Sequence, residues 1–192
     1  MEYLDLVDTA LFLFFNSFHN PFFDDLMLWV TNKFIWIPLY AFLIGFIIYI
    51  KRAKSVYLIV AAALLIFLSD RTTSGLMKPY FKRLRPCHES ALASQMTLVG
   101  SCGGEYGMAS SHAANTFAVA TFVFLLFPAF TKYFVWLFPW ALLVSFSRIY
   151  LGVHYPGDVV VGALIGAVYG VIVISGINFF TQRSREFFTI KK

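Results

Sequence analysis

The chain alternates between long uncharged apolar runs and short polar connections. The apolar runs cover residues 34–50, 55–69, 113–131, 133–147 and 159–182. A helix that spans a membrane needs about 20 apolar residues, and fewer where polar groups at its ends reach the interface. The pattern therefore predicts an all-α integral membrane helical bundle with about five transmembrane helices. A soluble bundle in which every helix is buried is the weaker alternative.

The N-terminal part of the chain has a different pattern. Residues 3–18 place their apolar side chains on one helical face, with the aspartates off it. Asn20 and Pro21 then suit the start of a second helix, with asparagine as the cap and proline in the first turn. Both segments are short and charged, so we interpret them as helices that lie in the membrane interface. A sixth span that begins near Leu11 is the alternative.

Composition agrees with a membrane protein. The 192 residues are 59% hydrophobic and 13% charged, which is about half the charged fraction of a soluble domain. We expect one membrane-embedded domain over residues 1–192, with interfacial helices in 1–33, a catalytic helical bundle in 34–182 and a basic cytoplasmic tail in 183–192. No exposed basic face is left over, so nucleic-acid binding is excluded.

The basic residues indicate which helix ends face the cytoplasm. If residues 51–54 are cytoplasmic, Lys132 and the C-terminal basic residues fall on the same side, giving eight of the 15 Lys and Arg residues. Four of the other seven lie at helix ends or in a loop beside candidate chemical groups. The positive-inside rule then predicts the N-terminus outside and the C-terminus inside. Segments 79–110 and 148–158 would both open to the non-cytoplasmic face.

A four-residue spacing recurs on two of the predicted helices. Asp70, Ser74 and Lys78 share one helical face, which must point into protein or a water-filled cavity because polar groups at membrane depth are costly. Another stripe consists of small residues that let a neighbouring helix approach closely, namely Gly162, Gly166 and Gly170. Asp158 continues that spacing, so we expect its carboxylate to point inward.

Both cysteines lie in the polar loop of residues 79–110. In an oxidising compartment Cys87 and Cys102 could form a disulfide, which closes a loop of about 15 residues and stabilises the fold by roughly 3 kcal/mol. Two unpaired thiols are the alternative. The spacing does not resemble that of a zinc site.

Three polar clusters follow one another along the chain, and all are predicted to lie at one membrane face. Their lysine and arginine side chains supply charge for a multiply charged anion. The serines lie where a helix begins, so their N–H and hydroxyl groups can bind anionic oxygens. Two histidines remain for nucleophilic and acid–base chemistry. The clusters are Lys78 with Arg85 and Pro86; Ser110, Ser111 and His112; and Ser147, Arg148, His154 and Asp158.

These clusters resemble the three signature motifs of the type 2 phosphatidic acid phosphatase superfamily. That superfamily also includes bacterial lipid phosphatases, glucose-6-phosphatase and the vanadium haloperoxidases. The first and third motifs match in full. In the second motif the usual Pro-Ser-Gly-His sequence is replaced by Ala109, Ser110, Ser111 and His112, so a serine takes the place of the family's flexible glycine.

The resemblance implies a role for each motif residue. His154 attacks phosphorus and becomes a phosphohistidine, Asp158 holds its other ring nitrogen, and His112 protonates the leaving oxygen and then activates water. No metal and no cofactor are needed, because cations of the chain neutralise the phosphoryl charge. The phosphoryl oxygens are bound by Lys78, Arg85, Ser110, Ser111 and Arg148. His19 and His88 belong to no motif, and we interpret Asp70 and Arg71 as structural.

We therefore expect a membrane phosphatase that hydrolyses a lipid phosphate monoester or diphosphate, with the lipid substrate and the membrane lipids as its partners. The candidate substrates are an isoprenoid diphosphate, phosphatidylglycerophosphate, phosphatidate and lipid A. Compact size and the resemblance favour a bacterial cytoplasmic membrane, with the site facing the periplasm or the exterior. Two alternatives stay open: haloperoxidase-like vanadate chemistry, whose relatives are soluble, and a transporter or anion-binding protein, in which His154 and Asp158 would have no task.

Overall fold

The computed structural model describes the backbone of residues 2–189 and the side chains of residues 4–181. This part of the chain is helical, without strands, so the predicted all-α fold is confirmed. The α-helices are α1 (Glu2–Asn16), α2 (Pro21–Thr31), α3 (Ile37–Lys51), α4 (Ser55–Asp70), α5 (Lys78–Phe81), α6 (Ser111–Leu126), α7 (Thr131–Phe134), α8 (Leu137–Tyr150) and α9 (Pro156–Thr189). Short 3-10 turns connect several of them, and a π-helical segment, η3 (Arg71–Met77), joins α4 to α5.

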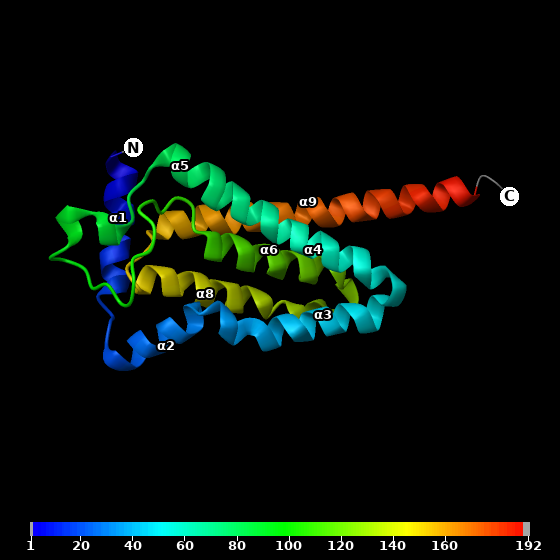
Figure 1. Ribbon diagram of the computed structural model, residues 1–192, viewed down its shortest axis with the longest axis horizontal. Helices are drawn as coiled ribbons and strands as arrows, with labels where there is room; N and C mark the ends of the chain where they lie inside the picture. Colours follow the sequence, from blue (N-terminus) through cyan, green and yellow to red (C-terminus); the bar gives the residue numbers. More distant parts are fainter. Residues whose placement is uncertain (1, 190–192) are drawn as a thin grey trace.

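The predicted apolar runs correspond to α3, α4, α6, α8 and α9. Two continuous helical runs are long and apolar enough to cross a membrane, Lys33–Phe81 and Pro156–Thr181. The first of them turns back at η2 (Arg52–Lys54), so α3 and α4 form a hairpin (Figure 1). A third span results if α6 and the segment Pro128–Phe134, which is bent from it by 101°, count as one. Because α8 is a shorter apolar helix, the number of five spans stays a prediction.

Helices α6 and α9 pack closely because small residues face each other between them. A Cβ atom added at Gly162 would meet the carbonyl oxygen of Ser110, and one added at Gly166 would meet that of Ala114. The small-residue stripe predicted from the spacing is therefore a contact between helices, as expected. This close packing also holds the N-terminal ends of α6 and α9 together, where two of the motifs lie.

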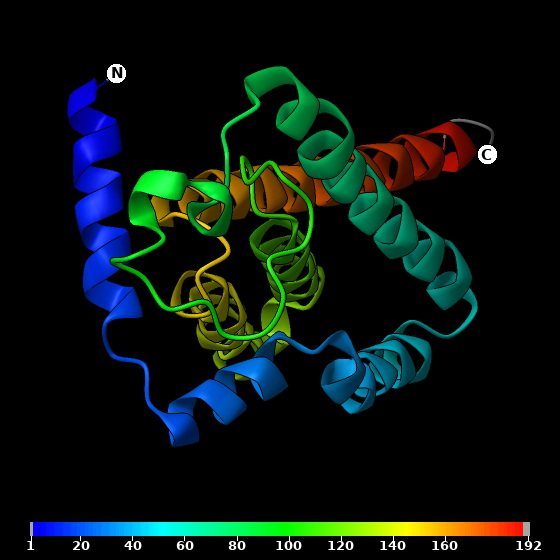
Figure 2. The same cartoon turned by 60° about the vertical axis from the view of Figure 1, so that its left-hand side comes forward.

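The two N-terminal helices pack against the end of the bundle that carries the motifs (Figure 2). The side chain of Asn20 accepts a hydrogen bond from the Phe23 N–H at 3.1 Å, and Pro21 lies in the first turn of α2, as predicted. Asn16 at the end of α1 is buried and donates to the carbonyl oxygens of Thr97 and Tyr150, both at 2.8 Å. These bonds fasten α1 to the loop and to α8. The interfacial position of α1 and α2 stays a prediction.

The charged connections separate to opposite ends of the bundle. The loop of residues 82–110 and the α8–α9 connection lie at the same end as α1, whereas the α3–α4 hairpin lies at the other end with the last turns of α9 (Figure 1). The sequence predicted this separation from the basic residues. The side chains of the basic tail, residues 183–192, lie outside the described part of the chain.

Candidate active site

The third motif forms a buried histidine–carboxylate pair at the turn between α8 and α9. Gly152 turns the chain with a φ of 83°, and a Cβ atom there would come within 2.9 Å of the Thr97 carbonyl oxygen. His154 is 2% exposed and Asp158 is fully buried. The Nδ1 atom of His154 lies 3.2 Å from Oδ2 of Asp158. The carboxylate therefore holds one ring nitrogen and leaves Nε2 available for chemistry.

The surroundings of His154 favour a neutral imidazole. Burial lowers its pKa from 6.5 to about 4, although Asp158 acts in the opposite direction. Burial of this kind disfavours the charged form of a histidine. At neutral pH the ring is therefore unprotonated, and Nε2 carries the lone pair that a nucleophile requires.

Arg85 is fixed by backbone carbonyl groups of the polar loop. It is 8% exposed, and its guanidinium donates from Nε to the Tyr106 oxygen at 3.2 Å and from Nη1 to the Cys102 oxygen at 3.1 Å. A disulfide joins Cys102 to Cys87, with the Cα atoms 5.9 Å apart. The bridge and the guanidinium thus stabilise the same stretch of loop. His88 lies beside the bridge, but the two sulfurs are bonded to each other and are not free to ligate a metal.

Ser111, at the start of α6, joins the first and second motifs. Its Oγ lies 2.7 Å from Oγ of Ser74 and accepts from Oγ1 of Thr73 at 2.9 Å and from Nζ of Lys78 at 3.4 Å. Ser74 also donates to Asp70 at 3.4 Å. The polar face predicted on this helix therefore points toward α6. The π-helical segment η3 carries two of these contacts, and such distortions are frequent at functional sites.

Two polar atoms at the site have no hydrogen-bond partner among the described residues. They are Oγ of Ser110, a fully buried residue, and Nε of Arg148. Arg148 is anchored at one tip only, where Nη1 donates to Oγ1 of Thr31 at 2.6 Å. Because buried polar groups are normally paired, these two atoms are free to bind a ligand. Donors from an arginine and a serine suit a phosphate oxygen.

The residues of the three motifs converge at one end of the bundle. The backbone N–H of Ser110 donates to the carbonyl oxygen of Asp158 at 2.9 Å, which joins the second motif to the third. His112 lies close enough to His154 and Arg148 to interact with both electrostatically. Lys78 and Arg85 also interact electrostatically with the imidazole of His112. The arrangement can hold a multiply charged anion beside two imidazoles, one of which is oriented by a carboxylate.

Comparison with known proteins agrees with this geometry. Residues 54–182 match the sequence model of the PAP2 superfamily. The chain belongs to the PAP2 superfamily. It is 40% identical to the lipid A 4'-phosphatase of Bacteroides thetaiotaomicron, over 88% of this chain and 76% of that protein. It is 33% identical to the lipid A 4'-phosphatase of Porphyromonas gingivalis, over 88% of this chain and 72% of that protein.

Two solved structures share the architecture. The crystal structure of Aquifex aeolicus LpxE superposes with a TM-score of 0.64 and 28% identity, covering 87% of this chain and 94% of that one. A transmembrane PAP2 phosphatidylglycerolphosphate phosphatase from Bacillus subtilis superposes with a TM-score of 0.70 over 93% of this chain and 87% of that one; at 18% identity it supports the fold alone. The protein is thus an integral membrane phosphatase of the lipid phosphatase branch.

One part of this PAP2 site was not predicted from the sequence. Arg83, between the fixed positions of the first motif, donates from Nη1 to Oδ1 of Asp158 at 3.0 Å. Its Nη2 lies 2.8 Å from Oδ2 of Asp8, and its guanidinium stacks 4.2 Å from the Tyr155 ring centroid. Asp8 also accepts the Gly157 N–H at 2.7 Å. Helix α1 is therefore connected to the carboxylate of Asp158 through Arg83. The only signal in the sequence was the aspartates that lie off the apolar face of α1.

Proposed function

We propose that the protein removes a phosphate group from a lipid A-type lipid through a phosphohistidine on His154. The observation that carries this proposal is the buried His154–Asp158 pair, which lies beside unpartnered donors of Ser110 and Arg148. Two relatives, 40% and 33% identical to this chain, are lipid A 4'-phosphatases, which favours this substrate over the other lipid phosphates.

In the first proposed step, Nε2 of His154 attacks the phosphorus in line with the leaving oxygen. Asp158 accepts a hydrogen bond from the Nδ1–H group of His154 and stabilises the imidazolium that forms, as in other carboxylate–histidine pairs. The N–P bond forms while the ester P–O bond breaks. The bound phosphate dianion offsets the positive charge of Lys78, Arg85 and Arg148 around His112, so that His112 is protonated in the substrate complex and donates this proton to the departing sugar oxygen.

In the second proposed step, His112 is neutral and takes a proton from water. The resulting hydroxide attacks the phosphohistidine, the N–P bond breaks, and inorganic phosphate is released. His154 returns to its neutral form with Nδ1 still held by Asp158, and His112 is again protonated. Both steps use the same two imidazoles in exchanged roles, so the cycle needs no further acid or base.

Charge stabilisation comes from the three motif cations. Lys78, Arg85 and Arg148 all act electrostatically on His112, so a phosphoryl group beside that ring would lie within reach of them. Such fixed charges stabilise the oxygens of a transferring phosphoryl group more than those of the ground state. The hydroxyls of Ser110 and Ser111 add donors. The proposed mechanism therefore assigns neutralisation to the chain itself.

We further propose that the site faces the periplasm or exterior of a bacterial cytoplasmic membrane. The basic hairpin of residues 51–54 lies at the opposite end of the bundle from the motifs (Figure 1), and short basic loops favour the cytoplasm. The disulfide between Cys87 and Cys102 lies at the motif end, where an oxidising compartment would preserve it. After reduction, a membrane-impermeant thiol reagent should label these cysteines from outside; labelling only from the cytoplasmic side would invert the arrangement.

Phosphate release from purified full-length protein tests the function. The substrates are lipid A, an isoprenoid diphosphate, phosphatidylglycerophosphate and phosphatidate, each in the presence of EDTA. We expect lipid A to be hydrolysed fastest, and His154→Gln to lower the rate by roughly a thousandfold or more. His19→Gln is the matched control, because His19 is exposed and outside the motifs.

Three results would count against parts of the proposal. Equal release by wild type and His154→Gln would remove the nucleophile assignment. Hydrolysis of another lipid phosphate without lipid A would remove the substrate assignment. A rate that depends on an added divalent metal would contradict charge neutralisation by the chain alone.

A further inference from the structure

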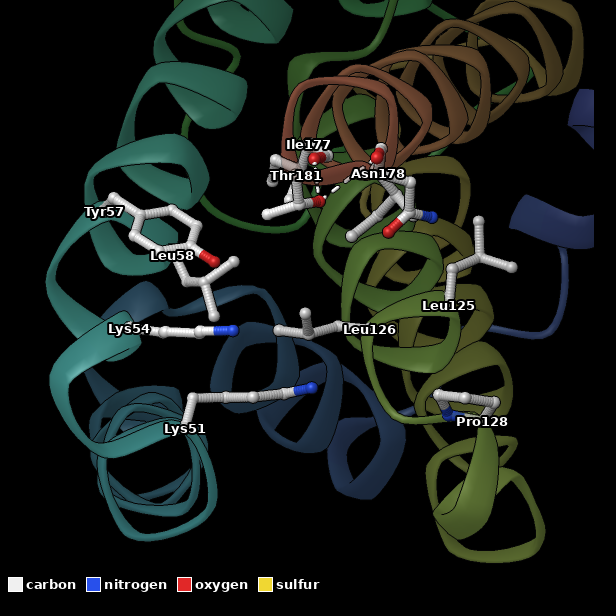
Figure 3. A pocket seen from close by; sticks show the side chains of 11 residues that line it. Lys51, Lys54, Tyr57, Leu58, Leu125, Leu126, Pro128, Ile177, Asn178 and Thr181 are labelled. Carbon is white, nitrogen blue, oxygen red and sulfur yellow. Dashed lines mark hydrogen bonds between the residues drawn. The ribbon is translucent and has the colours of Figure 1, made fainter. Parts of the chain in front are cut away.

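A hollow with a volume of about 410 Å³ lies at the end of the bundle opposite the motifs, between α4, α6 and α9 (Figure 3). Its polar wall combines two side chains from the α3–α4 hairpin with one from α4 and two from α9. No signature motif reaches it. The polar residues are Lys51, Lys54, Tyr57, Asn178 and Thr181.

The two lysines direct positive charge into this hollow. The amino groups of Lys51 and Lys54 both extend from the hairpin toward α6 and α9 (Figure 3). Nζ of Lys51 also lies 5.1 Å from the centre of the Phe127 ring, a cation–π contact that favours this direction. None of the ion pairs among residues 4–181 includes either lysine. Two neighbouring ammonium groups without a paired carboxylate in this part of the chain favour an anion between them.

An apolar groove continues from the charged hollow along the outside of α4 and α9. Its volume is about 420 Å³, and it shares Tyr57, Ile177 and Thr181 with the charged hollow. Val173 and Gly176 line the rest of it together with Phe180. A Cβ atom added at Gly176 would meet no atom within 4 Å, so the groove is open at this point. Polar and apolar parts therefore adjoin, as in a lipid.

We propose that this composite site binds an anionic phospholipid of the surrounding membrane. The phosphodiester of the headgroup lies between Lys51 and Lys54, and an acyl chain follows the groove past Gly176. Lysine binds phosphate as a point charge, and basic pockets between transmembrane helices bind anionic lipid headgroups. The Tyr57 hydroxyl and the Asn178 amide supply further donors. A phosphodiester lacks the monoester that the catalytic motifs would attack, so this lipid is a bound partner and not a substrate.

Lipid binding at this composite site requires neither the proposed substrate nor the phosphohistidine. It requires only that the chain is embedded in a membrane. A lipid held against α4 and α9 would stabilise the packing of these two helices, because anything that binds the folded state alone stabilises it. The measurable consequence is a rise in thermal stability that depends on the lipid headgroup.

The test uses the full chain in a mild detergent, titrated with short-chain phosphatidylglycerol and, separately, with phosphatidylcholine of the same chain length. Affinity is read from the shift of the unfolding midpoint and by native mass spectrometry. We expect phosphatidylglycerol to bind the wild type. Its affinity should fall about fivefold for each lysine removed in Lys51→Gln and in Lys54→Gln. Lys132→Gln is the matched control, because Lys132 does not line the hollow and its Nζ lies 4.9 Å from the Tyr133 ring centre.

A second variant addresses the acyl chain without changing charge. Gly176→Leu should obstruct the groove and weaken phosphatidylglycerol binding, while both lysines remain. Phosphate release by every variant shows that it is folded, since none of these residues lies near the motifs. Equal phosphatidylglycerol affinity in the wild type and in a variant that combines Lys51→Gln with Lys54→Gln would overturn the proposal. So would an equally large loss in Lys132→Gln, phosphatidylcholine binding as tight as that of phosphatidylglycerol, or full stabilisation by inorganic phosphate alone.

Discussion

Replacing Asp8 with asparagine tests whether helix α1 holds the carboxylate of Asp158 in place. Oδ1 of Asp8 accepts the Gly157 N–H at 2.7 Å, and Oδ2 lies 2.8 Å from Nη2 of Arg83. The same guanidinium holds Asp158 through Nη1 at 3.0 Å. Both contacts of Asp8 thus act on the segment that carries the carboxylate. The residue is nearly buried, with 14% of its side chain exposed.

The magnitude follows from what asparagine can offer. Its side chain has one acceptor oxygen and one donor group, so one of the two donors that face Asp8 would meet another donor. A hydrogen bond to a charged group contributes about 1.5–3 kcal/mol. If the transition state loses this free energy because Asp158 is held less firmly, kcat falls about tenfold to a hundredfold. KM should change little, because Asp8 is proposed to act through Arg83 and not through the substrate.

Asp5→Asn provides the matched control. Asp5 also approaches Nη2 of Arg83, at 3.3 Å, but 65% of its side chain is exposed. Exposed ion pairs contribute about 0.2–1 kcal/mol, so kcat should fall by about fivefold at most. Steady-state phosphate release, with thermal unfolding as a check on folding, measures both variants. Wild-type kcat in Asp8→Asn, or equal losses in the two variants, would refute the positioning role.

Three further predictions concern stability in detergent. Because burial lowers the pKa of His154 from 6.5 to about 4, the unfolded chain binds a proton between these values that the folded protein does not. The neutral His154 therefore contributes its full stabilisation above pH 6.5, and the free energy of unfolding falls by roughly 3 kcal/mol as the pH is lowered toward 4. His154→Gln should reduce this loss when unfolding is measured over that pH range. Gly166→Ala should destabilise the protein by about 1–3 kcal/mol, because the added Cβ would meet the backbone of α6. Gly176→Ala on the same helix is the control and should be neutral or stabilising. Equal unfolding midpoints for the two variants would contradict the close packing of α6 and α9. Reducing the bond between Cys87 and Cys102 should cost roughly 3 kcal/mol by loop entropy, so an unfolding midpoint that reductant leaves unchanged would show that the bridge does not stabilise the loop.

The sequence predicted those parts of the molecule that depend on local spacing. The four-residue spacing of Gly162 and Gly166 predicted the face of α9 that packs on α6, and it placed the carboxylate of Asp158 inward, where the structure has it. These two predictions about α9 succeed because a helix converts residue spacing directly into a face. The assignment of the site residues from the motif spacing stays a prediction.

Contacts between distant segments could not be predicted in this way. No periodicity connects Asp8 on α1 with Arg83 in the loop and Gly157 at the start of α9, because only the packed fold brings them together. The role of Ser111 also follows from the fold. Its hydroxyl contacts the η3 segment and Lys78, so the serine in place of the family's glycine links α6 to the first motif.

Trapping of the phosphoenzyme tests the central claim most directly. Full-length protein is mixed with lipid A labelled with ³²P at its phosphate groups, denatured in base during turnover, and digested for peptide mapping. The proposed mechanism predicts an acid-labile, base-stable label on the peptide that contains His154 and none in His154→Gln. A label on another residue, or a label of equal amount in His154→Gln, would contradict the mechanism.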